Sequence, residues 1–150
     1  MIVLTRIDNR LIHGQIVQGW LPSLNASEVL IVSPKVVQKI FLQKMLRLAL
    51  PSGYKLTIKE AKDAVKYAAE SAEKVFIIIE DIENLIEMIK EGFSPKVITL
   101  GNTQFMEGKK QYSQGVFLSE EEVKELKKLE TEKQISVEIR SLPTSLVTKL

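Results

Sequence analysis

The stretch Arg6–Gln15 contains two arginines, one aspartate and the only histidine of the chain. A neutral imidazole nitrogen is nucleophilic near neutral pH, and its phosphoramidate product is reactive enough to pass a phosphoryl group onward. A planar guanidinium group can hold phosphoryl oxygens through paired, charge-assisted hydrogen bonds. Because glycine has no side chain, Gly14 leaves the neighbouring His13 open to an approaching partner. These residue types at this spacing favour phosphoryl transfer through His13.

Six residues of this stretch can be given a role in such a transfer. We expect His13 to be the nucleophile and Arg10 to stabilise the charge that develops on the phosphoryl oxygens, so these two are the candidate catalytic residues. The candidates for binding phosphate or orienting the catalytic groups are Arg6, Asp8, Gly14 and Gln15. A helix from about Gly14 through Trp20 would add free backbone N–H groups to the site.

Simpler interpretations of the same residues stay open at the level of spacing. A single histidine is more often an ordinary surface or hydrogen-bonded residue than a catalyst. Arginines can serve only to solvate a loop, and Asp8 can serve only to cap a turn. Trp20 is interpreted as core packing, and the pair Lys109-Lys110 as part of a solvated loop rather than a partner surface. The spacing indicates a phosphate site without excluding a structural role for His13.

The composition excludes several other kinds of chemistry. The chain has no cysteine, so disulfides, thiolate catalysis and cysteine-ligated metal centres are excluded. No second histidine is available for a metal site, and no Walker A, Gly-x-Gly-x-x-Gly or Gly-x-Ser-x-Gly motif is present, so we expect no metal and no cofactor. The net charge of +2, with charges of alternating sign, argues against nucleic acid as a partner.

Apolar runs of strand length alternate with segments of helical periodicity along the chain. Strands are predicted at residues 2–7, 29–32, 54–58, 75–79, 97–100, 116–118 and 135–139. Helices are predicted from Pro34 to the Pro51-Ser52-Gly53 stop, over 61–68, from the Asp81 cap to Gly92, and after a capping box at Ser119. The segment 142–150 gives no clear pattern.

This alternation predicts an α/β fold in which residues 1–150 form a single, doubly wound domain. We expect a mostly parallel sheet with helices on both faces and a ligand site at the carboxyl ends of its strands. No internal linker or repeat divides the chain. No apolar segment approaches the roughly 18 residues of a membrane span and no signal peptide is evident, so we expect a cytoplasmic protein.

The run Arg6-Ile-Asp-Asn-Arg-Leu-Ile-His-Gly-Gln15, followed by Trp20, resembles the active-site signature of phosphotransferase system IIB components of the mannose, fructose and sorbose family. The likeness extends through nearly the whole chain, including Val32-Ser33, the loop with Gly108-Lys-Lys-Gln111, and the Ser119 capping box. At two positions the chain departs from the family pattern. Asn9 stands where many members have aspartate, and Asn102 stands where paired glycines are frequent.

The resemblance implies a role in sugar transport as a transferase and phosphoprotein. His13 would accept a phosphoryl group from a phosphohistidine of a IIA protein, with Arg10 in contact with phosphate. It would pass the group to a sugar translocated by the membrane subunits IIC and IID, either free in the cytoplasm or held at the inner face of the membrane by them. A regulatory phosphoprotein with the same chemistry, or a non-enzymatic binding domain, are the alternatives. The identity of the sugar cannot be read from this chain.

Overall fold

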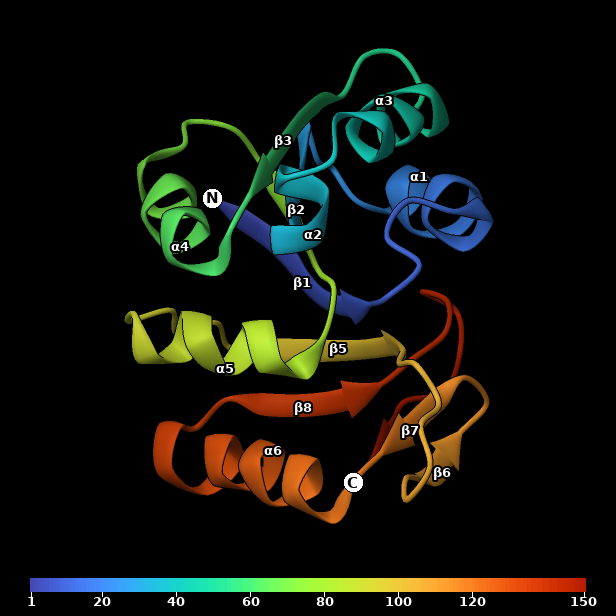
Figure 1. The fold of residues 1–150 in the computed structure, drawn as a ribbon, viewed down its shortest axis with the longest axis vertical. Helices are drawn as coiled ribbons and strands as arrows, with labels where there is room; N and C mark the ends of the chain where they lie inside the picture. The colour runs from blue at the N-terminus through green and yellow to red at the C-terminus, as the bar shows by residue number, and fades with distance from the viewer.

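The computed structural model describes residues 1–150 and contains a seven-stranded sheet between two layers of helices (Figure 1). The order of its strands is β3-β2-β4-β1-β5-β8-β9, and every neighbouring pair is parallel except β8 with β9. In chain order these strands are β1 (Ile2–Asp8), β2 (Glu28–Val32), β3 (Lys55–Lys59), β4 (Val75–Ile79), β5 (Val97–Asn102), β8 (Ser136–Ile139) and β9 (Thr148–Lys149). The predicted fold class is confirmed.

The two faces of the sheet are covered by different helices. One face carries η1 (Gln15–Trp20), α1 (Leu21–Ser23), α2 (Pro34–Val37) and α3 (Ile40–Ala49). The other face carries α4 (Ala61–Glu70), α5 (Ile82–Lys90) and α6 (Glu120–Lys133). Each layer has its own hydrophobic core, because alternate residues of a strand point to opposite faces.

Strand β4 is central to both cores. All five of its residues, Val-Phe-Ile-Ile-Ile, are fully buried, as expected of a parallel strand that is covered on both sides. Val75, Ile77 and Ile79 pack under the α4–α6 layer, whereas Phe76 and Ile78 pack under the layer formed by α1 to α3. This strand fixes the position of β1, its neighbour in the sheet.

The predicted helix that starts at Pro34 is interrupted. Lys39 adopts an extended conformation (φ −123°, ψ 101°), so α2 ends and α3 begins as a separate helix. The side-chain amide of Gln43 donates to the carbonyl oxygens of Val36 (3.1 Å) and Val37 (3.0 Å). These bonds satisfy carbonyls at the end of α2, which a continuous helix would have paired with its own backbone.

The predicted capping residues lie where the sequence places them. Ser33 accepts a hydrogen bond from the Val36 N–H, and Asp81 accepts one from the Asn84 N–H. Ser119 and Glu122 form the reciprocal capping box that opens α6, and Gly92 adopts a positive φ of 99° after α5. The three caps begin helices shortly after strands β2, β4 and β7 (Val116–Leu118), and Gly92 follows the end of α5.

The strand predicted at 116–118 is confirmed as β7, whereas strands β6 (Lys110–Ser113) and β9 were not predicted. The loop after β5 contains a hairpin of β6 and β7, turned at Gly115. The C-terminal segment adds β9, antiparallel to β8. None of the helices is long and apolar enough to cross a membrane.

Candidate active site

The stretch Arg6–Gln15 lies at the carboxyl end of β1, the strand between β4 and β5. The element after β1 covers one face of the sheet, whereas α5 and α6, which follow the two neighbouring strands, cover the other. The chain therefore diverges at this point, which is where ligands bind in open α/β sheets. The site lies at the edge of the sheet that the sequence predicts.

The loop after β1 folds back on Asp8, the last residue of the strand. The Leu11 N–H donates to the Asp8 carbonyl at 3.1 Å, and the Arg10 N–H donates to Asp8 Oδ1 at 3.1 Å. Leu11 adopts a left-handed conformation with φ 61°, which is unusual for a bulky residue and reverses the chain sharply. The reversal brings the side chains that follow back toward Asp8.

The buried carboxylate of Asp8 is the common acceptor of the site. Arg10 donates to it through two atoms, from Nε to Oδ1 at 3.0 Å and from Nη2 to Oδ2 at 3.0 Å. His13 Nε2 lies 3.1 Å from Oδ2, and Arg6 Nε lies 3.4 Å from the same oxygen. The structure thus brings together the aspartate, the histidine and both arginines of the predicted cluster.

The pKa of Asp8 is lowered from 3.8 to about 2. Burial alone would raise this pKa, but hydrogen bonds from His13 and Arg10, together with the charges of these two groups, lower it by more. Asp8 is therefore a carboxylate at neutral pH and can only accept hydrogen bonds.

This carboxylate determines which nitrogen of His13 is free. Because Asp8 can only accept, the proton between the two groups lies on Nε2, and the lone pair of the neutral ring lies on Nδ1. The His13 side chain keeps 18% of its surface exposed, so the ring is accessible in part while one of its edges is fixed. The arrangement holds a histidine in the tautomer whose nucleophilic atom is Nδ1.

Arg6 is a fully buried residue and not a surface cation. Its guanidinium group donates to the carbonyl oxygens of Arg140 (2.7 Å) and Ser141 (3.2 Å), in addition to Asp8. Burial lowers the pKa of Arg6, and the charge of Asp8 opposes this effect. Its position favours the predicted orienting role over direct contact with phosphate.

Trp20 and Gly101, which are far apart in the sequence, both lie against the Arg6 side chain. The guanidinium carbon lies 4.9 Å from the ring centroid of Trp20, whose Nε1 donates to the Ser141 carbonyl at 2.9 Å. A side chain at Gly101 would overlap the guanidinium group. Trp20 is 3% exposed, which agrees with its interpretation as core packing.

Gly14 and Gln15 lie at the start of the helix that follows His13, but this helix is not an α-helix. A Cβ at Gly14 would meet no atom within 4 Å, so the space beside His13 is open. Gln15 Oε1 accepts from Arg10 Nη2 at 3.1 Å. The helix expected from Gly14 through Trp20 is the π-helix η1. At its end, the Leu21 N–H donates to the carbonyl oxygen of Ile16, five residues earlier. Pro22 lacks the N–H that an α-helical ladder would need next.

The two positions that depart from the family pattern contact each other. Asn102 Nδ2 donates to Asn9 Oδ1 at 2.6 Å, and the Asn9 N–H donates to the Asn102 carbonyl at 3.2 Å. A side chain at Gly115 would overlap Asn102, so this glycine admits the contact. The pair connects the His13 loop to the end of β5. The sequence did not indicate that these two asparagines contact each other.

The remaining candidate positions lie outside this cluster. Lys109 pairs with Glu122 of the α6 capping box at 3.1 Å and is only 16% exposed, so it is a structural ion pair rather than a solvated residue. No group of three or more histidine, aspartate or glutamate side chains lies close enough to hold a metal ion.

Comparison with known proteins decides the family. The family described as the sorbose subfamily IIB component of the PTS system, the phosphotransferase system, matches residues 2–149. The chain belongs to this family. As a IIB component it is a phosphotransferase component of the sugar phosphotransferase system. The resemblance of the Arg6–Gln15 run to this family is thus confirmed.

Relatives and solved structures agree with this assignment. The chain is 32% identical over 135 residues to the sorbose-specific EIIB component of Lacticaseibacillus casei, covering 86% of this chain and 80% of the relative. It is similar in structure to the N-acetylgalactosamine-specific IIB component 1 of Escherichia coli, with a TM-score of 0.93, 25% identity, and coverage of 100% and 99%. It is also similar to manxB of Thermoanaerobacter tengcongensis, with a TM-score of 0.91, 28% identity, and coverage of 99% and 92%.

The close approach of Arg6 to Gly101 generates a stability prediction. Gly101→Ala should destabilise the IIB component by about 1–3 kcal/mol, because the new methyl group must displace a buried guanidinium group. Gly14→Ala is the matched control and should change stability by less than about 0.5 kcal/mol, because its methyl group enters open space. Urea unfolding measures both variants. Equal stabilities would contradict the packing described for Arg6.

The lowered pKa of Asp8 generates a pH prediction. An acid with a lowered pKa in the folded state stabilises the fold above its ordinary pKa of 3.8, and this stability is lost as pH falls toward about 2. At 1.36 kcal/mol per pKa unit, the contribution of Asp8 is about 2 kcal/mol. The stability gap between the native protein and Asp8→Asn should therefore shrink by about this amount from pH 5 to pH 2 in urea unfolding. Parallel pH curves would show that Asp8 does not titrate in this way.

Proposed function

We propose that this IIB component carries a phosphoryl group on Nδ1 of His13. The group comes from a phosphohistidine of a IIA protein and goes to a sugar that membrane IIC and IID subunits translocate, so the component works at the inner face of the membrane. The observation that carries the proposal is the 3.1 Å contact between His13 Nε2 and Asp8, which leaves Nδ1 as the free nucleophile. Membership of the IIB family supports the class of reaction.

In the proposed transfer, the Nδ1 lone pair of His13 attacks phosphorus while the bond between phosphorus and the donor imidazole breaks. The His13 ring gains positive charge as the new bond forms, because Nε2 keeps its proton. The carboxylate of Asp8 stabilises that charge and holds the ring in place, as the buried aspartate does in a catalytic triad. In the second transfer, the acceptor hydroxyl attacks phosphorus, the bond between Nδ1 and phosphorus breaks and its electron pair returns to Nδ1. The hydroxyl proton is released to solvent, so the site returns to its starting state.

Arg10 is the residue best placed to contact the phosphoryl oxygens. Its hydrogen bonds engage Nε and Nη2, which leaves both N–H groups of Nη1 without an acceptor. The side chain is 35% exposed and shares the Asp8 carboxylate with His13. A guanidinium group fixed on one edge and free on the other can bind developing charge with little reorganisation.

The nature of the donor is supported by a fused relative. The chain matches the mannose-specific EIIAB component of Escherichia coli at 29% identity and spans 45% of its length. The name of that protein joins A and B components in one chain, which supports a IIA protein as the source of the phosphoryl group. A separate IIA protein would then reach His13 by docking on the exposed part of its loop.

The site of labelling tests this proposal directly. Incubation with phosphorylated IIA should label the native protein once, on Nδ1 of His13, and His13→Ala should abolish the label, since no other imidazole is present. Acid lability and the phosphorus–proton couplings in NMR distinguish Nδ1-phosphohistidine from the Nε2 isomer. Label on Nε2, or acid-stable label in His13→Ala, would refute the proposed mechanism.

The role of Arg10 is tested by a substitution that keeps its charge. Arg10→Lys should slow phosphoryl transfer by about tenfold or more, because an ammonium group cannot bridge Asp8 and phosphate through two edges. The exposed Arg47→Lys is the matched control and should transfer at the native rate. Quench-flow measurement at saturating phosphorylated IIA separates the transfer step from docking. A native rate for Arg10→Lys would remove Arg10 from the catalytic set.

A further inference from the structure

Helix α3 has a second apolar stripe that no part of the chain covers. Leu46 faces the core and is 8% exposed, as expected of an amphipathic helix on a sheet. Phe41, Met45 and Leu48, spaced four and three residues apart along another side, are 70%, 50% and 88% exposed. Three large, exposed apolar side chains on one stripe of a helix are unusual on a surface that faces only water.

Three exposed basic side chains accompany this stripe, one at the N-cap of α3 and two along the helix. Residues 29–59 contain six lysines and arginines and no acidic residue, although the net charge of the whole chain is only +2. Lys39, Lys44 and Arg47 of this segment are exposed and take part in no ion pair within the chain. The rest of the chain consequently has a net charge of −4. Lys35 pairs with Glu80 at 3.4 Å, and Lys55 and Lys59 lie over the Tyr67 ring of α4 on the opposite face of the sheet. The free positive charge beside the apolar stripe therefore comes from Lys39, Lys44 and Arg47.

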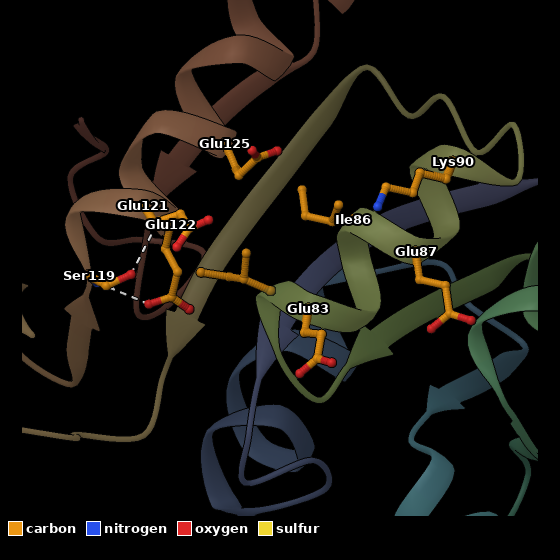
Figure 2. A pocket seen from close by; sticks show the side chains of 9 residues that line it. Glu83, Ile86, Glu87, Lys90, Ser119, Glu121, Glu122 and Glu125 are labelled. Atoms are coloured by element: carbon orange, nitrogen blue, oxygen red, sulfur yellow. Dashed lines mark hydrogen bonds between the residues drawn. The ribbon is translucent and has the colours of Figure 1, made fainter.

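One groove on the opposite face of the sheet is acidic. Figure 2 shows glutamates of α5 and α6 lining one groove, with Lys90 as the single base among them. These two helices pack on the core layer away from α3. The domain is thus polarised, with a basic and apolar face at α3 and an acidic groove at α5 and α6.

We propose that α3 binds to the surface of an anionic lipid bilayer. A helix with Phe, Leu and Met on one side and lysine and arginine beside them is the pattern of interfacial helices, whose apolar side chains enter the headgroup region. Lys39, Lys44 and Arg47 would lie among anionic headgroups, which attract nearby basic residues. The acidic groove on the other face would be repelled and would point away from the bilayer.

The same orientation brings the His13 loop near the bilayer. A hollow of about 240 Å³ beside α3 is lined by Met45 and Ala49 of the helix and by Arg10, Leu11 and Ile12 of the loop. A bilayer in contact with the stripe would therefore lie beside the loop. This contact goes beyond the phosphoryl chemistry and does not depend on it, so His13→Ala should bind lipid as the native protein does.

Vesicle sedimentation with the full chain tests the proposal. The native protein should bind vesicles of phosphatidylcholine with about 30% phosphatidylglycerol, and binding should fall when salt rises from about 0.05 M to about 0.5 M. Phe41→Ser with Leu48→Ser should reduce partitioning by about tenfold or more. Lys44→Gln with Arg47→Gln should reduce it about fivefold for each charge removed.

Matched controls separate the stripe from general effects of the substitutions. Leu146→Ser removes an apolar side chain that is 92% exposed elsewhere, and Lys124→Gln with Lys127→Gln removes two exposed charges of α6, so both should bind as the native protein does. A Leu48→Trp variant should show a blue-shifted emission on vesicles, whereas the buried Trp20 of the native protein should not respond.

Three outcomes would overturn the proposal. These are no binding to anionic vesicles at low salt, unchanged binding by the double serine variant, or an unshifted Leu48→Trp emission. A double serine variant that binds vesicles normally but needs more phosphorylated IIA for half-maximal transfer would assign the stripe to protein docking instead.

Discussion

The geometry around His13 depends on one buried carboxylate. Asp8 is fully buried at the end of a central strand, and burial of an unpaired charge would cost several kcal/mol. The cost is offset because Arg6, Arg10 and His13 all direct donors to its two oxygens. Satisfying the charge therefore fixes three side chains at once, and the orientation of the imidazole is a consequence of that balance.

The two arginines have different electrostatic roles at the site. Arg6 lies beneath Asp8, in contact with Trp20 and with the carbonyls of Arg140 and Ser141, and supplies a permanent buried counter-charge. Arg10 lies at the rim, with part of its guanidinium group in solvent. One cation thus supports the framework while the other remains free to meet a ligand, although both occur within a few residues of the same strand end.

Much of the fold could be predicted because its signals are local. The buried strand Val75–Ile79, the caps Ser33, Asp81 and Ser119, and the stop at Gly92 each depend on neighbouring residues. The interruption at Lys39 was missed because the amide of Gln43 competes with the helix from several residues away. Strands β6 and β9 were missed because they are short and gain their pairing only from neighbouring strands, β7 and β8.

The candidate site was predictable in its membership but not in its geometry. The side chains of Arg6–Gln15 stood out as a cluster because their types suit phosphate chemistry, and the structure brings Arg6, Asp8, Arg10 and His13 together. The burial of Arg6, the left-handed Leu11 and the Asn9–Asn102 contact were not recognisable. Each depends on a partner that is distant in the sequence or on a backbone angle that the residue type does not predict.

The carbonyl groups that hold Arg6 have a consequence for the biosynthesis of the protein. Arg6 is made 134 residues before Arg140 and 135 residues before Ser141, the two residues that supply its acceptors. A nascent chain that lacks these carbonyls would leave a guanidinium group buried without partners, which is strongly unfavourable. The histidine loop therefore takes its final form only after translation has passed Ser141.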